Sequence, residues 1–236
     1  MFYKNPVMLD KKFHADLSLT DKLSFSFAAK VNAVPVSIVE LPNVMQFYPI
    51  AFSAQAPATP LAILGLRDNE NLFVDENGKW SENTYIPAYI RRYPFIFSTD
   101  DSGQQLTLCI DSADGLLEKS NVNPLFTPNG DLTDLTKNAL EFCRSYQVAA
   151  EQTLGFSKAI EESHILIDRH AEARLNDGET ITLSGFRQID ENKFYELPKE
   201  IIQNWHEQRW SGFIYAHLLS IGNWQRLFQL LEKRKS

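Results

Sequence analysis

The chain has 236 residues, 44% of them hydrophobic and 22% charged, so it is long enough to bury a core and its composition excludes a disordered chain. With 30 acidic and 23 basic residues, its formal charge is −7, and it lacks the positive field that draws proteins to nucleic acid. No run of about 18 uncharged apolar residues occurs, so no transmembrane segment is expected.

The first half of the chain has the pattern of short strands joined by polar turns. Residues 23–27 alternate apolar and polar side chains, which predicts a strand with one buried face. The pair Asn77-Gly78 tolerates positive φ and predicts a tight turn. Strands are predicted at residues 23–27, 34–39, 48–52, 61–66, 72–74, 79–80, 95–97 and 106–110, with polar turns at 75–78 and 100–103.

The hydrophobic period changes after a connector at residues 121–130, which contains two prolines and a glycine. From Leu135 to Thr153, apolar side chains recur three and four residues apart and predict a helix. Gly155 is expected to end this helix, and residues 156–167 are expected to start a second one.

A hairpin is predicted next, with strands at residues 173–175 and 180–189. Residues 176–179, with the sequence Asn-Asp-Gly-Glu, supply its turn.

The C-terminal part is again helical. Pro198 suits the first turn of a helix, and an apolar stripe runs from residue 202 to residue 221. Gly222 is expected to end that helix in a left-handed cap, before a last helix that completes a C-terminal helical hairpin. A strand-rich half with a mostly antiparallel sheet, a helix pair, a β-hairpin and a helical hairpin predict an α+β fold, in one domain of residues 1–236.

The cysteines and the N-terminus favour a soluble, cytoplasmic protein. Cys109 and Cys143 lie far apart in the sequence and in no metal-binding spacing, so reduced thiols are expected. No apolar stretch of signal-peptide length follows Lys4.

Several segments resemble a known family when taken together and in order. The sequences LGL, ENLFVD, GKW and YIPAYIRRYPF stand at residues 64–66, 70–75, 78–80 and 85–95, and YPIAF precedes them at 48–52. LSGF follows at 183–186 and IYAHLLSI at 214–221. This series resembles the bacterial SapC family and covers nearly the whole chain.

The resemblance implies a setting rather than a mechanism. The family takes its name from a protein associated with a bacterial surface layer. Its members are also met beside genes for outer-membrane nutrient receptors, flavin-dependent halogenases and cupin-like hydroxylases. No catalytic residue comes to this chain from the family, and a permease reading conflicts with the lack of a membrane span.

The richest candidate for a binding site is the segment around Arg91 and Arg92. If Pro87 opens a short helix, tyrosines four residues apart share one face beside the two arginines. Such guanidinium groups can bind a carboxylate, a phosphate or a peptide's C-terminus, and the alternative is that the tyrosines pack and the arginines pair with carboxylates. The candidate ligand-binding residues are Trp80, Tyr85, Tyr89, Arg91, Arg92, Tyr93 and, on the C-terminal stripe, His217.

His217 can be a base or ligand, with Ser220 three residues on, or a buried histidine bonded within the core. The triplets 14–16 (HAD) and 170–172 (HAE) resemble two members of a two-His-one-carboxylate iron site, a pattern that arises easily by chance. Neither a GxGxxG nor a P-loop pattern occurs. No cofactor and no metal are predicted.

The sequence therefore leads to a non-catalytic binding or adaptor protein for a peptide, protein or small anionic ligand. It would be linked to a surface layer or to outer-membrane nutrient uptake. The alternative is an enzyme that modifies an amino acid or peptide and uses His217 with one of the two triplets. A third reading is a structural or secretion accessory of a surface layer.

Overall fold

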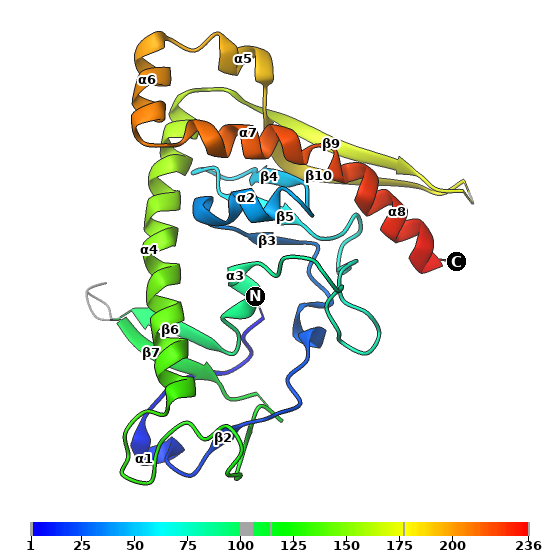
Figure 1. Ribbon diagram of the computed structural model, residues 1–236. Helices are drawn as coiled ribbons and strands as arrows, with labels where there is room; N and C mark the ends of the chain where they lie inside the picture. The colour runs from blue at the N-terminus through cyan, green and yellow to red at the C-terminus, as the bar shows by residue number, and fades with distance from the viewer. Residues whose placement is uncertain (1, 100–105, 114, 177, 236) are drawn as a thin grey trace. The chain divides into compact units, whose positions relative to one another are not determined.

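The computed structural model of the protein describes residues 2–99, 106–113, 115–176 and 178–235 (Figure 1). The chain divides into two compact units. Unit 1 contains Met1–Ser24 and Ile90–Val148, and unit 2 contains Phe25–Tyr89 and Ala149–Ser236. The long helix α4 (Asp134–Glu162) belongs to unit 1 up to Val148 and to unit 2 beyond it.

Unit 1 is built on a three-stranded antiparallel sheet in the order β1 (Pro6–Met8), β7 (Leu106–Asp111) and β6 (Phe95–Thr99). A second pair joins β2 (Ser18–Leu19) to β8 (Leu117–Glu118), and the short helix α1 (Lys11–His14) lies between β1 and β2 in the chain. The strands predicted at 95–97 and 106–110 are confirmed, while the turn predicted at 100–103 lies outside the described residues. The buried core consists of Leu19, Phe95, Leu108, Ile110, Leu125, Phe126 and Cys143.

Unit 2 contains a five-stranded antiparallel sheet in the order β3-β5-β4-β10-β9. The predicted strands at 48–52 and 61–66 appear as shorter strands, and the predicted hairpin is confirmed as β9 and β10 (yellow in Figure 1). The strands are β3 (Ala33–Pro35), β4 (Ile50–Ser53), β5 (Pro60–Ile63), β9 (Leu166–Arg174) and β10 (Thr180–Ile189).

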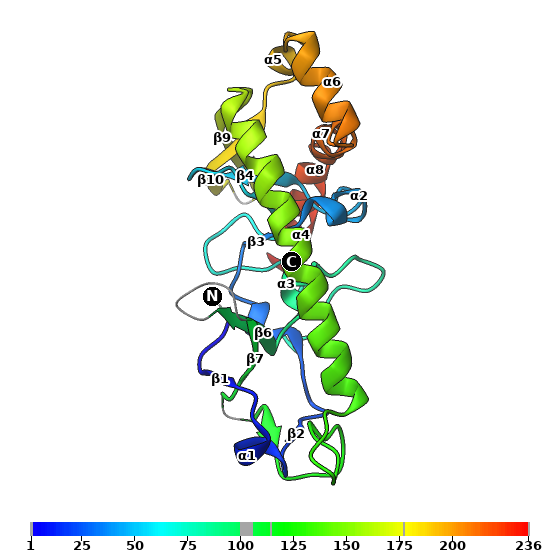
Figure 2. The ribbon, with the colours of Figure 1, turned by 90° about the vertical axis from the view of Figure 1, so that its left-hand side faces the viewer.

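Among the helices of unit 2, α2 lies between β3 and β4 in the chain, while α5 to α8 follow the sheet and end in a helical hairpin, as predicted. α7 contacts β4 and β10, and Figure 2 shows α5 and α6 leading into it. They are α2 (Leu41–Val44), α5 (Glu191–Tyr195), α6 (Lys199–Glu207), α7 (Ser211–Ser220) and α8 (Asn223–Lys235). The short helix α3 (Ala88–Arg91) contains the point where the chain passes from unit 2 to unit 1.

Four predicted strands of the first half are wrong or truncated. Residues 72–74 and 79–80 form no strand and are joined only by an isolated bridge between Val74 and Trp80. Residues 23–27 form no strand, because Phe25 starts the 3-10 helix η1 (Phe25–Ala28) and packs its ring on Trp80 at 5.6 Å. The strand expected at 34–39 stops at Pro35, which lacks an N–H for the ladder, and the 3-10 helix η2 (Ile38–Glu40) follows. At residues 23–27 a contact distant in sequence overrides the local alternation, whereas at residues 34–39 the proline itself ends the strand.

The helix boundaries also differ from the expectations. α4 runs through Gly155 to Glu162 because Phe156 and Ile160 continue its buried stripe, so the predicted break and second helix are wrong. The C-terminal stripe is instead split at Arg209, which takes a left-handed φ of 61°. Arg209 N–H bonds to the His206 carbonyl and the next N–H to that of Trp205, a Schellman ending built on arginine.

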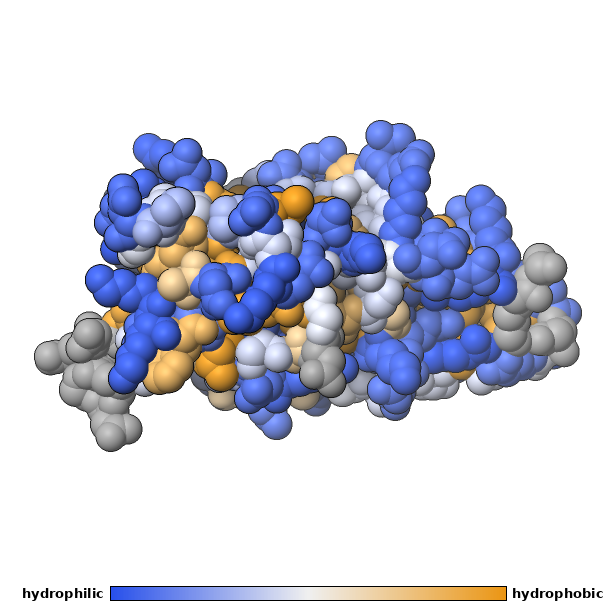
Figure 3. All heavy atoms as spheres, turned by 90° about the horizontal axis from the view of Figure 1, so that it is seen from below, coloured by the Kyte–Doolittle hydropathy of each residue, from blue (hydrophilic) through white to orange (hydrophobic). Residues whose placement is uncertain are grey.

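The described part of the chain contains no helix long and apolar enough to cross a membrane. Seen from below, Figure 3 shows hydrophilic residues over most of the face, with hydrophobic residues gathered in smaller groups between them. Cys109 and Cys143 are both buried and free. Burial raises the pKa of the Cys143 thiol to about 11, so this thiol is a packing group rather than a nucleophile.

Candidate functional site

The unit 2 members of the predicted site are held by internal contacts. Trp80 is buried, stacks on Phe73 and donates its indole N–H to Thr84 Oγ1 at 3.0 Å. The Tyr85 hydroxyl donates to Glu40 Oε1 at 2.9 Å. Tyr89 is half-buried on α3. Trp80 and Tyr85 therefore have structural roles in this unit.

Glu40 explains why a short helix starts after Pro87. This carboxylate is 5% exposed and accepts hydrogen bonds from the Ala88 N–H at 2.6 Å and from the Ser37 hydroxyl at 2.7 Å. Together with the bond from Tyr85, these donors compensate the buried charge. The hydrogen bonds of Glu40 thus connect Tyr85 and the first residue of α3 to η2, so this carboxylate has a structural role.

The unit 1 members place two guanidinium groups over aromatic rings. Arg91 is exposed and lies 5.1 Å from the centre of the Phe142 ring. Arg92 lies 4.5 Å from the Tyr146 ring and 5.7 Å from the Tyr3 ring. These distances are within the roughly 6 Å of a cation–π contact, and guanidinium groups are also the side chains best suited to bind a carboxylate.

Tyr93 is buried and belongs to the fold of unit 1. Its hydroxyl donates to Asp111 Oδ2 at 3.2 Å, and burial together with that carboxylate raises the pKa of Tyr93 to about 12. Asp111 also accepts the backbone N–H groups of Lys4 and Asn5. Because α3 spans only Ala88–Arg91, the expected helical face shared by tyrosines 85, 89 and 93 is wrong.

His217 connects two strands of unit 2 from within the core. Its side chain is fully buried, with Nδ1 2.9 Å from the Ile50 carbonyl oxygen and Nε2 3.1 Å from the Ile189 backbone nitrogen. Nδ1 therefore carries the proton and donates, while Nε2 accepts. Burial lowers the pKa of His217 to about 4. Both ring nitrogens are engaged, and this favours the structural reading of the residue.

Ser220 completes the same arrangement. Its hydroxyl donates to the His217 carbonyl at 2.6 Å and accepts the Ile50 N–H at 2.9 Å. It is completely buried and bonds to the histidine's backbone rather than to its ring. The imagined nucleophile and base are thus not paired with each other.

The two iron-like triplets do not form a metal centre. His14 Nδ1 contacts the backbone of Asp10, and Asp16 forms an ion pair of 2.6 Å with Lys119. His170 and Glu172 stand exposed on β9. Among the described residues, no group of three or more His, Cys, Asp and Glu side chains is placed to hold a metal ion.

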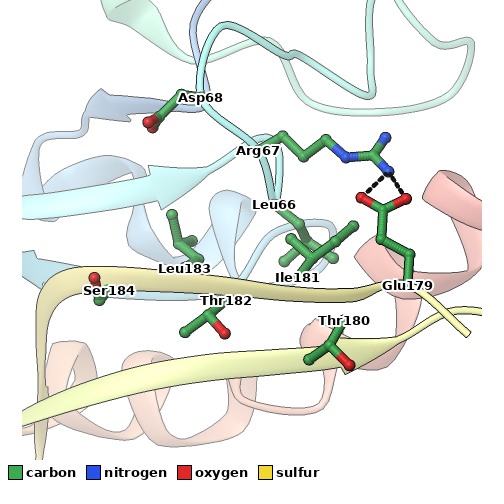
Figure 4. Close-up of a pocket in the computed structure, with 9 residues that line it drawn as sticks. All are labelled: Leu66, Arg67, Asp68, Glu179, Thr180, Ile181, Thr182, Leu183 and Ser184. Atoms are coloured by element: carbon green, nitrogen blue, oxygen red, sulfur yellow. Dashed lines mark hydrogen bonds and ion pairs between the residues drawn. The ribbon is translucent and has the colours of Figure 1, made fainter.

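A groove in unit 2 was missed by the sequence reasoning (Figure 4). It has a volume of about 430 Å³, within the roughly 300–1,000 Å³ typical of ligand sites. One wall is the loop after β5 and the other is the start of β10. We call it the β10 groove, and it is lined by Leu66, Arg67, Asp68, Glu179, Thr180, Ile181, Thr182, Leu183 and Ser184.

The β10 groove follows a strand edge. Residues 179–184 line it without a gap, whereas a groove over one face of a strand would be lined by alternate residues. β10 pairs with β9 over residues 180–183, but it pairs with β4 only at Phe186 and Arg187. In the described ranges, the second edge of residues 180–183 has no strand partner. Alternate backbone N–H and C=O groups there point away from β9.

A bulge separates this open edge from the paired part of β10. The register with β9 shifts between Leu183 and Phe186, and Gly185 has a φ of 81°. A glycine inside a predicted strand is the sequence signal that indicates such a bulge.

Acidic groups predominate around the β10 groove. Arg67 Nη2 donates to both oxygens of Glu179 at 3.0 Å, and its Nη1 lies 3.8 Å from Glu70 Oε1. Asp68 is exposed on the same wall. Glu70 Oε2 is buried and has no hydrogen-bond partner among the described residues. Three carboxylates against one guanidinium leave this region negative.

The fold and these sites define a two-unit α+β protein with an open strand edge beside an acidic groove. The chain belongs to the SapC family, whose model, described as SapC, matches residues 9–227 and so spans both units. No curated protein and no solved structure matches the chain.

Proposed function

We propose that the protein is a non-catalytic peptide-binding adaptor, which takes an extended segment of a partner protein into the β10 groove. The observation that carries the proposal is the unpartnered edge of residues 180–183, which opens into a groove of about 430 Å³. An extended peptide added to such an edge gains main-chain hydrogen bonds, and flanking pockets select its side chains.

The charges of the groove specify the peptide. Asp68, Glu70 and Glu179 outnumber Arg67, so a lysine or arginine on the peptide is favoured and an acidic side chain is repelled. Leu183 is half-buried and offers apolar contact in the same groove, which the buried Leu66 and Ile181 also line. The proposed ligand is therefore an extended segment that alternates apolar and basic residues.

Arg91 and Arg92 give unit 1 a separate place for an anionic group of a partner. Arg91 is exposed, and both guanidinium groups lie over aromatic rings. In this proposal the adaptor acts in the cytoplasm. Its partner is sought among surface-layer and outer-membrane uptake proteins, as the family association suggests.

The enzyme alternative depended on His217. The hydrogen bonds of its ring to Ile50 and Ile189 favour a structural role, because both nitrogens are used inside the core. No other observation on the described residues favours a reaction, so the adaptor is the better supported function.

The test uses a fluorescent peptide that alternates valine and lysine, with a valine–glutamate peptide for comparison, followed by fluorescence anisotropy. We expect the basic peptide to bind and N-methylation of its alternate residues to abolish binding, because the methyl groups remove the main-chain donors. Asp68→Lys should weaken binding about tenfold or more, equivalent to about 1.4 kcal/mol.

Glu207→Lys, on the exposed end of α6, changes the net charge equally and should leave binding intact. Equal binding of basic and acidic peptides, or no effect of N-methylation, would overturn the proposal.

A further inference from the structure

The last helix, α8, is anchored to the rest of unit 2 at its start and in its middle. At the start, Asn223 Nδ2 donates to the carbonyls of Met45 and Tyr48 at 2.7 and 3.1 Å. Gly222 has no positive φ, so the left-handed cap expected there is wrong, and hydrogen-bonded turns lead from α7 directly into α8. In the middle, Leu227 is completely buried. The last turn of α8 is therefore a fixed support for the segments that it contacts.

Glu232, in that last turn, holds the turn of the β9–β10 hairpin. Its Oε1 accepts the backbone N–H of Asn176 at 2.9 Å, and its Oε2 accepts the side-chain amide of the same residue at 2.6 Å. Two charge-assisted hydrogen bonds to one residue fix its orientation as well as its position. Asn176 lies three residues before Glu179, where the β10 side of the groove begins. Glu232 thus fixes the start of this wall.

Arg234, two residues further along α8, holds the other wall at its base. Its Nη1 donates to the Asn71 carbonyl at 2.8 Å and its Nη2 donates to the Val74 carbonyl at 2.7 Å. The N–H of Leu72 donates to the Leu64 carbonyl at 2.9 Å, which closes the loop that forms this wall. Arg234 therefore fixes the loop at the point where its two ends meet.

The two walls are also joined directly by the ion pair of Arg67 with Glu179, but that pair is a weak constraint. Its side chains are 31% and 46% exposed, so water and salt screen the attraction. The hydrogen bonds from α8 differ because they reach backbone groups, which are the N–H of Asn176 on one wall and two carbonyls on the other. Backbone positions determine how far the open edge of residues 180–183 lies from the facing loop.

We propose that the last turn of α8 sets the spacing of the β10 groove, with Glu232 and Arg234 as positioning residues. The inference rests on the proposed function, since this groove is where the peptide is received. Neither residue lines the groove, so each acts through the wall that it holds. A groove whose walls are already fixed binds more tightly, because less conformational entropy is lost when the peptide enters. Releasing either wall should therefore raise the dissociation constant of the peptide.

Arg234→Met gives the sharpest test, because charge and position predict opposite signs. Removing a cation near an acidic groove should by itself strengthen binding of the basic peptide, whereas a released loop should weaken it. We expect the dissociation constant of the valine–lysine peptide to rise about fivefold or more in fluorescence anisotropy. Lys233→Met, at the exposed neighbouring position, removes the same charge without these hydrogen bonds and should not weaken binding. Binding by Arg234→Met that equals or exceeds that of the wild type would overturn the proposal.

Substitutions of Glu232 test the other wall with the charge change held constant. Glu232→Gln keeps an oxygen for the Asn176 N–H and should bind the peptide nearly as well as the wild type. Glu232→Ala removes the same charge and both acceptors, so the dissociation constant should rise about fivefold or more. Asn176→Ala should weaken binding alone and add nothing to Glu232→Ala, because both act through one contact. Equal binding by Glu232→Ala and Glu232→Gln would overturn the role of Glu232.

Hydrogen exchange of the peptide-free protein separates this inference from the proposed function. We expect faster exchange of the β10 amides in Glu232→Ala, and of the hydrogen-bonded amides of residues 71–73 in Arg234→Met. Circular dichroism shows that each variant folds. If the wild type binds no peptide, the proposed function fails, while the exchange rates still decide whether α8 holds the two walls. Unchanged exchange in both variants would overturn the inference.

Discussion

Arg67 and Glu179 face each other at the β10 groove, joined by two hydrogen bonds of 3.0 Å from one guanidinium nitrogen. The two residues are 112 positions apart in the chain, so this pair ties the loop after β5 to the turn of the β9–β10 hairpin. The arginine also reaches toward Glu70. Its charge is thus already committed to carboxylates of the groove, which explains why we assign a basic rather than an acidic peptide to it.

Replacing Arg67 should therefore strengthen binding of a basic peptide. In Arg67→Met the groove keeps its carboxylates and loses its cation, so we expect a several-fold lower dissociation constant at low salt. The effect should fade at high salt. Because the ion pair is partly exposed, its loss should lower the free energy of unfolding by less than about 1 kcal/mol. Peptide titrations at two salt concentrations and urea unfolding provide the measurements.

Arg144→Met is the matched control, since it removes an exposed Arg–Glu pair from α4 in unit 1. It should leave peptide binding unchanged. Weaker binding in Arg67→Met than in Arg144→Met would show that the arginine contributes to the ligand and that the sign of the groove is misassigned.

The stability of the protein should fall as the pH drops from 6.5 to 4, because His217 is neutral in the core. Its pKa is lowered from 6.5 to about 4 in the folded chain by burial. Between these values the unfolded chain binds a proton that the folded chain does not, so acid favours unfolding, and above pH 6.5 the effect ends. The full window is worth on the order of 3 kcal/mol.

Urea unfolding at a series of pH values measures this slope. His217→Gln should have lower stability at pH 7, because Ile50 and Ile189 lose a well-placed partner, and a flatter dependence between pH 4 and 6.5. His170→Gln, at an exposed histidine of β9, should keep the wild-type slope. If both variants keep that slope, another group is responsible for the acid sensitivity.

Local patterns were sufficient where one signal determined the structure. The Asn-Asp-Gly-Glu turn predicted the β9–β10 hairpin, and the helical period predicted α4 and α8. The same reasoning failed at Gly155, where packing of Phe156 overrides a weak helix propensity. It also failed at Arg209, whose left-handed conformation no propensity indicates.

The candidate sites could be predicted less well than the secondary structure, because their geometry depends on tertiary contacts. His217 was singled out by type, but its role follows from the strands that happen to face its two nitrogens. The β10 groove brings residues 66–68 against residues 179–184. The hydrophobic pattern of a sequence does not show which distant segments come together, so this groove could not be predicted. The arginine pair was singled out because its residue types are distinctive, and its binding role stays a prediction. The aromatic neighbours of Arg92, Tyr3 and Tyr146, come from distant segments.

Two glycine substitutions should change stability in opposite directions. A Cβ at Gly65 would lie 2.1 Å from the Glu70 carbonyl oxygen, a backbone atom that must move, so Gly65→Ala should destabilise by about 1–3 kcal/mol. At Gly155 the same atom meets nothing within 4 Å inside a regular helix, so Gly155→Ala should stabilise by about 0.5–1 kcal/mol. Urea unfolding of the two variants measures both changes, and equal signs would contradict the packing around Gly65.

Substitutions of Arg91 and Arg92 should have different effects, because Arg92 supports the fold of unit 1 whereas Arg91 is available for binding. Arg92 makes cation–π contacts with the Tyr3 and Tyr146 rings, so Arg92→Ala should destabilise the fold by about 1 kcal/mol through the loss of these contacts. Arg91 is exposed, and Arg91→Ala should change stability by less than about 0.5 kcal/mol. If this surface takes an anionic group, Arg91→Ala should still weaken binding of a glutamate-rich peptide, because the lost guanidinium faced the ligand.

Thermal unfolding and fluorescence anisotropy of the same variants make the comparison. Arg92→Lys keeps the charge but loses the planar guanidinium, so it should resemble Arg92→Ala in stability and the wild type in peptide binding. Arg144→Ala, another exposed arginine of unit 1, serves as the control for net charge. If peptide binding weakens equally in Arg144→Ala and Arg91→Ala, the change follows from the net charge of the protein alone. Arg91 would then not belong to the proposed binding surface.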